Sequence, residues 1–306
     1  MNNDGGTTTR ADYRGVVLLL LAAIFWSLNG AMIQLIHDQG RGPHGVTIAF
    51  YRSLFAGLFL LPLARGKWRT LRSSNPTQSL WPIRSMALIG VVLFTLMTSS
   101  FVIANTKTEA ANAIILQYTS TFWVFGLSSW LLGEKPRTDD LWFVGLAMLG
   151  IIVIFTGKAS TDFVGLAIAL ASGLFFALLT ITIRRLRDSD SAAVTVLNNL
   201  GSAVLLFPVA AMFADLTLSP MAWILVITMG VVQFGVPYYL YTLGLARVRA
   251  YRAALITMVE PVLVPIWTYM AVGQTVPART LIGGTVILFA LVLFVWRSRT
   301  GNTGPG

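Results

Sequence analysis

The chain contains ten long apolar segments, which fall into two runs of five. They lie near residues 15–37, 44–64, 82–104, 109–132, 140–156, 163–184, 192–213, 220–244, 253–272 and 278–296. Most of them reach the roughly 20 residues that a helix needs to cross a 30 Å hydrocarbon core. Because each segment crosses once and five is odd, a second copy of a five-span unit must insert upside down. The sequence therefore predicts an all-α integral membrane protein, with ten transmembrane helices in two inverted five-helix repeats.

The two runs also match one another in sequence. Residues 15–28 align without a gap on 165–178, which places Trp26 opposite Phe176. A second ungapped register places 90–94 on 230–234 and continues across another span. Apolar helices resemble one another by chance, so the common order of the matches is what indicates an internal duplication.

The duplication predicts the organisation of the chain. We expect a tail, a first repeat, a linker, a second repeat and another tail, over 1–14, 15–156, 157–162, 163–296 and 297–306. The polar or glycine-rich ends, 1–12 and 300–306, are expected to lack regular structure.

The charged residues follow the predicted topology. Only 11% of residues are charged while 56% are hydrophobic, whereas a soluble domain carries about a quarter charged residues. Of the 22 lysines and arginines, 17 fall in every second loop or in the tails, and Arg41, Lys107, Lys158 and Arg279 fall on the other side. The positive-inside rule then places both termini in the cytoplasm. The net charge of +10 is thus a topology signal and does not indicate a nucleic-acid partner.

Several chemistries lack the residues that they need. There is no cysteine, so there is no thiol nucleophile or thiolate metal site, and no phosphate-binding Gly-x-x-x-x-Gly-Lys-Ser/Thr loop. His37 and His44 flank one short loop with only Asp38 as a carboxylate, which is a poor zinc set. We expect no metal and no cofactor.

Three short motifs carry a family resemblance. They are Arg52 in the second span, Gly133-Glu134 closing the fourth, and Glu260-Pro261 inside the ninth. With the ten-span count, the chain resembles the drug/metabolite transporter superfamily. It is most similar to the ten-helix EamA-type exporters, and within them to the aromatic amino-acid exporter branch. The resemblance implies export of amino acids or related metabolites.

Two positions depart from the pattern of this family. Thr121 stands where the first half is expected to carry the proline that matches Pro261, and Gln274 replaces the glutamate that matches Glu134. The first departure puts a symmetric backbone break in the two halves in doubt.

Polar and aromatic residues inside the spans predict a central cavity, because polar groups at membrane depth face a cavity or one another. The predicted substrate-binding residues are Trp26, Ser27, Asn29, Met97, Phe101, Gln117, Tyr118, Phe176, Gln233, Tyr238, Tyr241 and Glu260. Pro237 and Pro261 are predicted to act in gating, because each removes a backbone donor and can kink a helix.

Three charged residues allow two interpretations each. Glu260 is either a proton-responsive cavity group or a buried acid paired with a basic residue. Arg52 could hold a substrate carboxylate, but a structural role is favoured, with the side chain directed outward or paired internally. Glu134 is expected at a helix end near Lys135 and Arg137, away from the pathway.

The sequence thus predicts a secondary transporter and no enzyme. The expected activity is export of aromatic and other hydrophobic amino acids, or related metabolites, by alternating access across a bacterial inner membrane. Protons are considered as the coupling ion. The alternatives are a broad exporter of amphipathic drugs and metabolites, and a non-transporting membrane enzyme or scaffold. An enzyme should show a nucleophile and base, or paired acids, at membrane depth, and only Glu260 is visible there.

Overall fold

The computed structural model describes residues 5–37, 43–71, 82–107, 110–134, 140–155, 162–273 and 278–300. All regular elements within these ranges are helices. The predicted linker, except for Asp162, lies outside the described residues, as do Gln274, Lys135 and Arg137.

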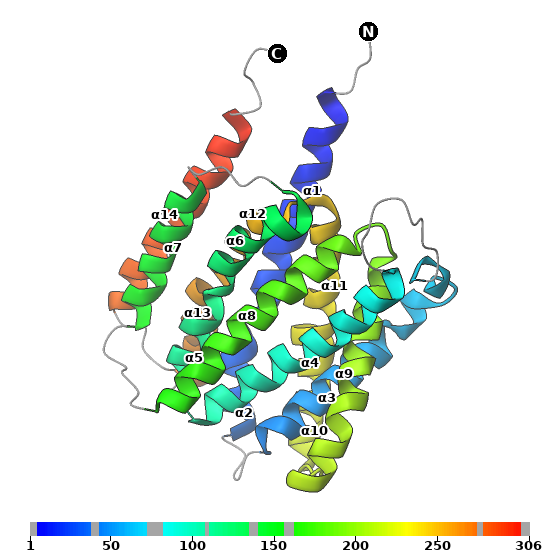
Figure 1. The fold of residues 1–306 in the computed structure, drawn as a ribbon. Coiled ribbons are helices and arrows are strands. Elements are labelled where there is room, and N and C mark those ends of the chain that lie inside the picture. The colour runs from blue at the N-terminus through cyan, green and yellow to red at the C-terminus, as the bar shows by residue number, and fades with distance from the viewer. Residues whose placement is uncertain are drawn as a thin grey trace.

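The first repeat forms five membrane spans, two of which are interrupted (Figure 1). Its elements are α1 (Gly5–Trp26), α2 (Asn29–His37), α3 (Gly45–Leu60), η1 (Leu61–Ala64), η2 (Trp68–Leu71), α4 (Ile83–Lys107), α5 (Ala110–Tyr118), α6 (Ser120–Leu132) and α7 (Asp140–Phe155). The first span consists of α1 and α2, and the fourth consists of α5 and α6.

The second repeat also forms five spans, and its eighth and ninth spans are interrupted. Its elements are α8 (Phe163–Arg185), α9 (Ser191–Phe213), α10 (Pro220–Thr228), the π-helical η3 (Met229–Gly235), α11 (Val236–Arg247), α12 (Ala250–Ile256), η4 (Thr257–Val259), α13 (Glu260–Val272) and α14 (Ala278–Thr300). All ten predicted spans are therefore helical over the residues that the structure describes.

In the described part of the chain, six helical segments are both long and apolar enough to cross a membrane by themselves. Shorter apolar helices occur at Tyr13–Trp26, Asp140–Val153 and Leu281–Phe294. These belong to the first, fifth and tenth spans, and the fourth span is divided between α5 and α6.

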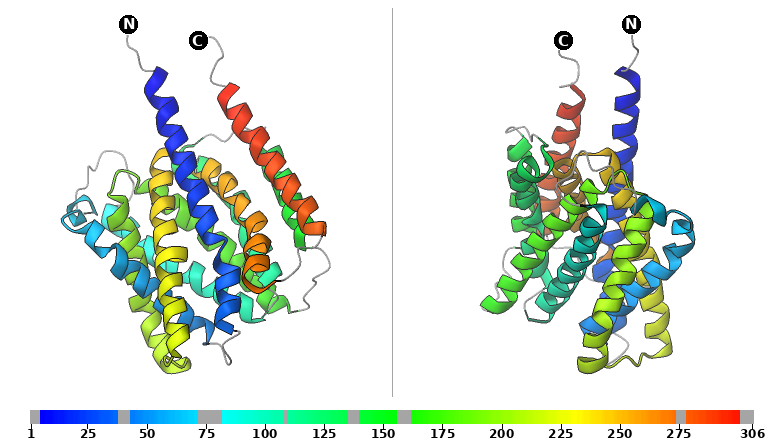
Figure 2. Two further views of the ribbon diagram at one scale, coloured as in Figure 1. Left: turned by 180° about the vertical axis from the view of Figure 1, so that it is seen from behind. Right: turned by 45° about the vertical axis from the view of Figure 1, so that its right-hand side comes forward.

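The contacts between the two repeats are reciprocal. Span 1 packs on span 8 through α1 and α11, and span 6 packs on span 3 through α8 and α4. Spans 2 and 7 (α3 with α9) and spans 5 and 10 (α7 with α14) pack on one another. Figure 2 shows α1 beside α11, and α14 beside α7. Such exchange of partners is the signature of two-fold symmetry, here between inverted repeats.

Both halves break the helix at equivalent points. In the register that matches Gly133 with Gly273, the break at Thr119 corresponds to η4. At each break a threonine hydroxyl donates to the carbonyl three residues earlier, from Thr119 to Leu116 at 2.5 Å and from Thr257 to Ala254 at 3.0 Å. These bonds satisfy carbonyls in the interrupted turns. The symmetric break therefore forms without a proline at Thr121, which removes the doubt raised by the sequence.

The first described residues are more regular than expected. Helix α1 begins at Gly5, inside the segment predicted to lack structure, and α14 continues to Thr300. The prediction was wrong for residues 5–12, because extending an existing helix adds one hydrogen bond for each residue fixed. The beginning of α1 and the end of α14 lie on the same side of the bundle (Figure 1). We call this the terminal side, and the other the opposite side.

Candidate functional site

A pocket lies where the interrupted spans of the two repeats meet. It is lined by Trp26, Asn29, Arg52, Met97, Phe101, Ile114, Gln117, Tyr118, Phe176, Gln233, Phe234, Tyr238, Thr257, Glu260 and Val264. Its cavity volume is about 70 Å³, and the empty space amounts to about 750 Å³ when the part open to solvent is included. Irregular backbone at membrane depth is tolerated where it lines such a cavity.

Ten of the twelve predicted substrate-binding residues line this pocket, and Ser27 and Tyr241 do not. Residues that the prediction did not include are Arg52, Ile114, Phe234, Thr257 and Val264. Thr257 and Val264 share a helix face with Glu260, so helical periodicity was the signal for them. The sequence contained no comparable signal for Phe234, because aromatic residues are common throughout the spans and one of them does not by itself indicate a pocket.

Glu260 connects the break in the fourth span with the break in the ninth through a hydrogen bond. It is the first residue of α13, and its Oε2 accepts a hydrogen bond of 2.7 Å from the hydroxyl of Tyr118, the last residue of α5. None of the ion pairs found among the described residues includes Glu260. Its partner is thus a neutral hydroxyl, so the interpretation as an acid paired with a basic residue was wrong.

Pro261 occupies the first turn of α13, directly after Glu260. A helix start tolerates proline, because the N–H that proline lacks would have no intrahelical partner there. Pro237 likewise occupies the first turn of α11, after the π-helical η3. Both prolines therefore follow a stretch of irregular helix, the π-helical η3 and the 3-10 turn η4, within longer helical segments. Their gating role remains a prediction.

Arg52 lies on the other side of the pocket and is only 5% exposed. Its Nη2 donates to the hydroxyl of Thr98 at 2.5 Å, and its Cζ lies 4.2 Å from the ring centroid of Phe234. The favoured structural role predicted a side chain directed outward or paired internally, and the Thr98 hydroxyl and the Phe234 ring are internal partners. Helix α3 directs the Arg52 side chain toward the pocket, where it is buried. No described carboxylate lies within 4.0 Å of it.

Aromatic side chains form the terminal-side wall of the pocket. The ring of Trp26 packs edge-on against Tyr238 at 4.9 Å and against Phe176 at 6.0 Å, measured between ring centroids. Tyr238 also contacts Phe94 and Phe234, each at 4.8 Å. Edge-to-face pairs of this kind contribute about 0.5–1.5 kcal/mol each beyond area burial. The wall is therefore a stable apolar surface.

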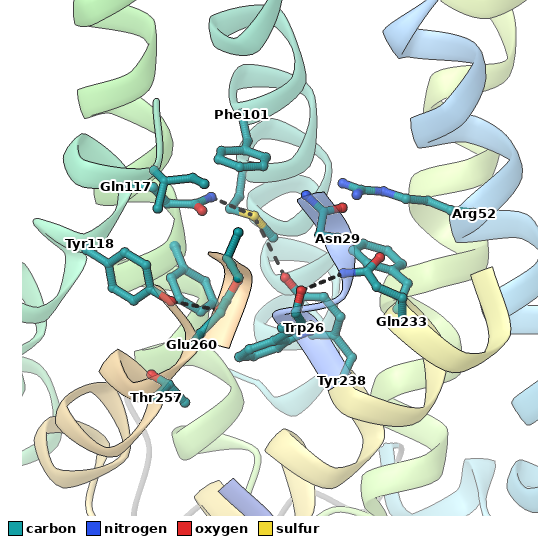
Figure 3. Close-up of a pocket in the computed structure, with 15 residues that line it drawn as sticks. Trp26, Asn29, Arg52, Phe101, Gln117, Tyr118, Gln233, Tyr238, Thr257 and Glu260 are labelled. Carbon is teal, nitrogen blue, oxygen red and sulfur yellow. Dashed lines mark hydrogen bonds between the residues drawn. The ribbon is translucent and has the colours of Figure 1, made fainter. Parts of the chain in front are cut away.

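Figure 3 shows how the polar lining divides. Gln117, Tyr118 and Glu260 lie on one side, whereas Asn29, Arg52 and Gln233 lie on the other (Figure 3). Met97 lies between them and accepts weak hydrogen bonds from the Gln117 amide and the Tyr238 hydroxyl, at 3.8 and 3.9 Å. The pocket thus combines aromatic surface with separate acidic and basic corners.

Comparison with known proteins decides the family. The model of the EamA-like transporter family matches the chain twice, over residues 13–156 and 163–296. The chain belongs to the EamA-like transporter family. The predicted membership in the drug/metabolite transporter superfamily, and the fold of two inverted repeats, are confirmed.

Named relatives of this EamA-like protein are transporters. An uncharacterized transporter of Archaeoglobus fulgidus is 31% identical over 92% of this chain and 96% of its own. A protein of Pseudomonas aeruginosa named a pseudopaline exporter is 24% identical over 91% of this chain and 94% of its own. A crystal structure with 17% identity covers 94% of this chain and 98% of its own, with a TM-score of 0.79. That likeness establishes the fold alone.

Ser27 and Tyr241 support the pocket of this EamA-like transporter from outside it. The Ser27 hydroxyl donates to the carbonyl of Ile24 at 2.6 Å and accepts from the indole N–H of Trp267 at 2.7 Å. Tyr241 is 1% exposed and hydrogen-bonds Thr180 at 2.7 Å. Both side chains are occupied inside the protein, so the structure does not place them as solute contacts.

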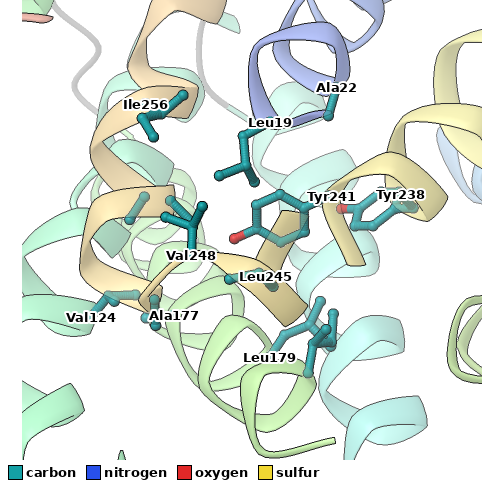
Figure 4. Close-up of a cluster of buried hydrophobic side chains, with 14 of the residues drawn as sticks. Leu19, Ala22, Val124, Ala177, Leu179, Tyr238, Tyr241, Leu245, Val248 and Ile256 are labelled. Atoms are coloured by element: carbon teal, nitrogen blue, oxygen red, sulfur yellow. The ribbon is translucent and has the colours of Figure 1, made fainter. Parts of the chain in front are cut away.

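Buried side chains fill the space among the helices between the pocket and the terminal side. Figure 4 shows part of this cluster. Leu19 on α1, Leu179 on α8, and Tyr241 and Leu245 on α11 are each at most 1% exposed. In contrast, the lining residues on segments that lead to the opposite side are partly exposed, namely Asn29, Phe101, Ile114, Gln117 and Val264. The pocket is therefore closed toward the terminal side.

An ion pair reinforces this closed side. The Nε of Arg184 on α8 donates to Oε1 of Glu134 at 2.8 Å, and its Nη1 donates to the carbonyl of Leu245 at 2.6 Å. The other carboxylate oxygen of Glu134 accepts from the backbone N–H of Ala250 at 2.9 Å, at the first residue of α12. Glu134 does lie at a helix end, but its partner comes from the second repeat.

Metal binding has no visible site. Among the residues that the structure describes, no group of three or more histidine, cysteine, aspartate or glutamate side chains could hold an ion.

Proposed function

We propose that this protein is a secondary transporter that exports aromatic and other hydrophobic amino acids, or related metabolites, from the cytoplasm. The observation that carries the proposal is the pocket between the repeats, in which the aromatic wall of Trp26, Phe176 and Tyr238 faces amide and charged groups. A solute with a large flat apolar part and a few polar atoms matches such a lining.

The proposed mechanism is alternating access. Rocking one repeat against the other around a central site is the general mode of inverted-repeat transporters. With both termini in the cytoplasm of a bacterial inner membrane, the closed terminal side is the cytoplasmic side, and this conformation faces outward. Export then requires the Glu134–Arg184 contact and the buried side chains around Tyr241 to separate.

Single cysteines test the accessible surface, because the chain contains none. In the outward-facing conformation Gln117→Cys should react with a water-soluble maleimide added from outside, whereas Tyr241→Cys should be protected. Equal labelling of both positions, or of neither, would contradict the proposed conformation.

Glu260 is the proposed coupling group. It is an acid at a helix break, held by a neutral Tyr118 hydroxyl at 2.7 Å, so it can exchange a proton without breaking an ion pair. Glutamine at this position cannot titrate. Glu260→Gln should therefore abolish the effect of an imposed pH gradient on export, and an unchanged response would leave Glu260 with a structural role.

The deciding experiment is flux through purified protein in liposomes. Labelled phenylalanine, tryptophan, threonine and a sugar phosphate are compared, with and without a pH gradient, against protein-free liposomes. Selective movement of the aromatic amino acids supports the proposal. If none of the four solutes moves, the amino-acid assignment fails.

A second candidate is a broader exporter of amphipathic metabolites or drugs. The observation that favours it is the relative named a pseudopaline exporter. Flux of amphipathic cations at rates similar to phenylalanine would support this alternative.

A further inference from the structure

The pocket contains a buried cation without a counter-ion. Arg52 is 5% exposed and lies over the Phe234 ring. Among the residues that the structure describes, its only hydrogen bond goes to the neutral Thr98, and its Nε–H has no hydrogen-bond partner. A buried charge is costly unless it is paired. Arginine also presents a planar set of donors that matches a carboxylate. An anion of carboxylate geometry would match the free donors of this guanidinium.

Unsatisfied acceptors accompany this unsatisfied donor. The Oδ1 of Asn29 and the Oε1 of Gln233 are both buried and accept no hydrogen bond. The other atom of the Gln233 amide, Nε2, donates to the carbonyl of Trp26 at 3.4 Å. Figure 3 places both amides beside the Arg52 guanidinium, on one side of the pocket. Most buried polar groups are satisfied, so this cluster indicates a ligand with an acceptor and a donor close together.

We propose that Arg52, Asn29 and Gln233 form the subsite for the head group of an α-amino acid. Arg52 donates to the carboxylate, and the two amide oxygens accept from the ammonium group. The apolar side chain of the substrate then lies against Trp26 and Phe176. This inference rests on the proposed function and adds to it a specificity-determining residue, Arg52.

The charges of the lining exclude a phosphate as the preferred anion. Arg52 is the one cation among the described residues that line the pocket, and Glu260 places a carboxylate in the same space. A dianion would need a second cationic donor and would be repelled by Glu260. A zwitterion carries no net charge and supplies both groups that the cluster lacks.

The test compares solutes that differ only in the head group. Binding of tryptophan, tryptamine (no carboxylate) and indole-3-propionate (no ammonium) to the purified full-length protein is measured by competition with labelled tryptophan. Because a hydrogen bond to a charged group is worth roughly ten- to a hundredfold in affinity, tryptophan should bind at least about tenfold more tightly than either analogue. Equal affinities would overturn the head-group subsite.

Variants of Arg52 test whether this residue binds the carboxylate of the substrate. Arg52→Gln should remove the preference for tryptophan over tryptamine, and Arg52→Lys should retain part of it because the charge remains. Arg247→Gln makes the same chemical change at an exposed arginine that bonds only its own helix, and it should behave as wild type. If Arg52→Gln folds and keeps the full preference, the assignment to Arg52 is wrong.

The comparison of analogues on the wild-type protein stands even if a variant fails to fold. It also separates the two proposals. Transport of tryptophan without discrimination against tryptamine overturns the head-group subsite and leaves the exporter function standing. If labelled tryptophan neither binds nor moves, both the function and the subsite fall.

Discussion

Two arginines are buried in the described part of this protein, and their surroundings differ. Arg184, on the terminal side, is 9% exposed and bonds the carboxylate of Glu134 and the carbonyl of Leu245. Arg52, in the pocket, is 5% exposed and bonds only the Thr98 hydroxyl. Burial alone therefore does not distinguish a structural arginine from one that is available to a ligand. The identity of the partner does.

The two carboxylates nearest to these regions repeat the contrast. Glu134 is held by Arg184 and by the backbone N–H of Ala250, whereas Glu260 is held by the neutral hydroxyl of Tyr118. On the terminal side opposite charges satisfy one another and fasten α6, α8 and α12 together. In the pocket the charges are kept apart, so a solute or a proton can interact with them.

The largest expected effect comes from breaking the paired arginine. Arg184→Met leaves Glu134 buried without its cation, and losing one partner of a buried ion pair costs about 3–5 kcal/mol. We expect a clear fall in the unfolding temperature in detergent. The double variant Glu134→Leu/Arg184→Met, which removes both charges, should recover much of the loss. A single variant as stable as wild type would mean that this ion pair contributes nothing to the closed side.

Substitution of Arg52, the arginine without a described counter-ion, should affect substrate binding much more than the free energy of unfolding. Arg52→Met removes a buried charge that has no counter-ion, so the free energy of unfolding should change by at most about 1 kcal/mol. The thermal stabilisation that saturating tryptophan gives to wild type should disappear. A destabilisation as large as that of Arg184→Met would show that Arg52 is a structural residue after all.

Removal of the Tyr118 hydroxyl tests the pocket carboxylate. Tyr118→Phe deletes the hydrogen bond to Glu260 and should reduce stability by about 1 kcal/mol, the usual net value of such a bond. Export should keep its response to a pH gradient but with a shifted pH profile, because the environment of Glu260 changes. Flux measured over a series of pH values checks this, and an unaltered profile would exclude any influence of Tyr118 on Glu260.

The smallest effect is expected at Thr98, which positions Arg52. Thr98→Val keeps the shape of the side chain but removes the only hydrogen-bond acceptor of the guanidinium. We expect the tryptophan preference over tryptamine to weaken by roughly two- to fivefold, less than the value of a full charged contact. Thr98→Ser, which retains the hydroxyl, should restore it.

The helix interruptions could be predicted from the sequence only in part. Pro261 gave a local signal in the ninth span, but the fourth span breaks at Thr119 with no proline nearby. A glycine on another helix gives this break the space that it needs. A Cβ on Gly173 of α8 would come within 2.7 Å of the Leu116 carbonyl, so the absence of a side chain there lets the interrupted turn lie against α8. Such a contact between distant segments has no local sequence pattern.

The sequence by itself determined the ten spans, the duplication and the family, because hydrophobic length and repeated order are properties of the chain alone. It also identified ten of the residues that line the pocket, since polar groups at membrane depth gather around a cavity. Only the tertiary structure decided how charges are paired. Glu134 meets Arg184 across 50 positions, and Arg52 meets no acid among the described residues. Pairing depends on which helices pack together, and packing joins segments that are far apart in the chain.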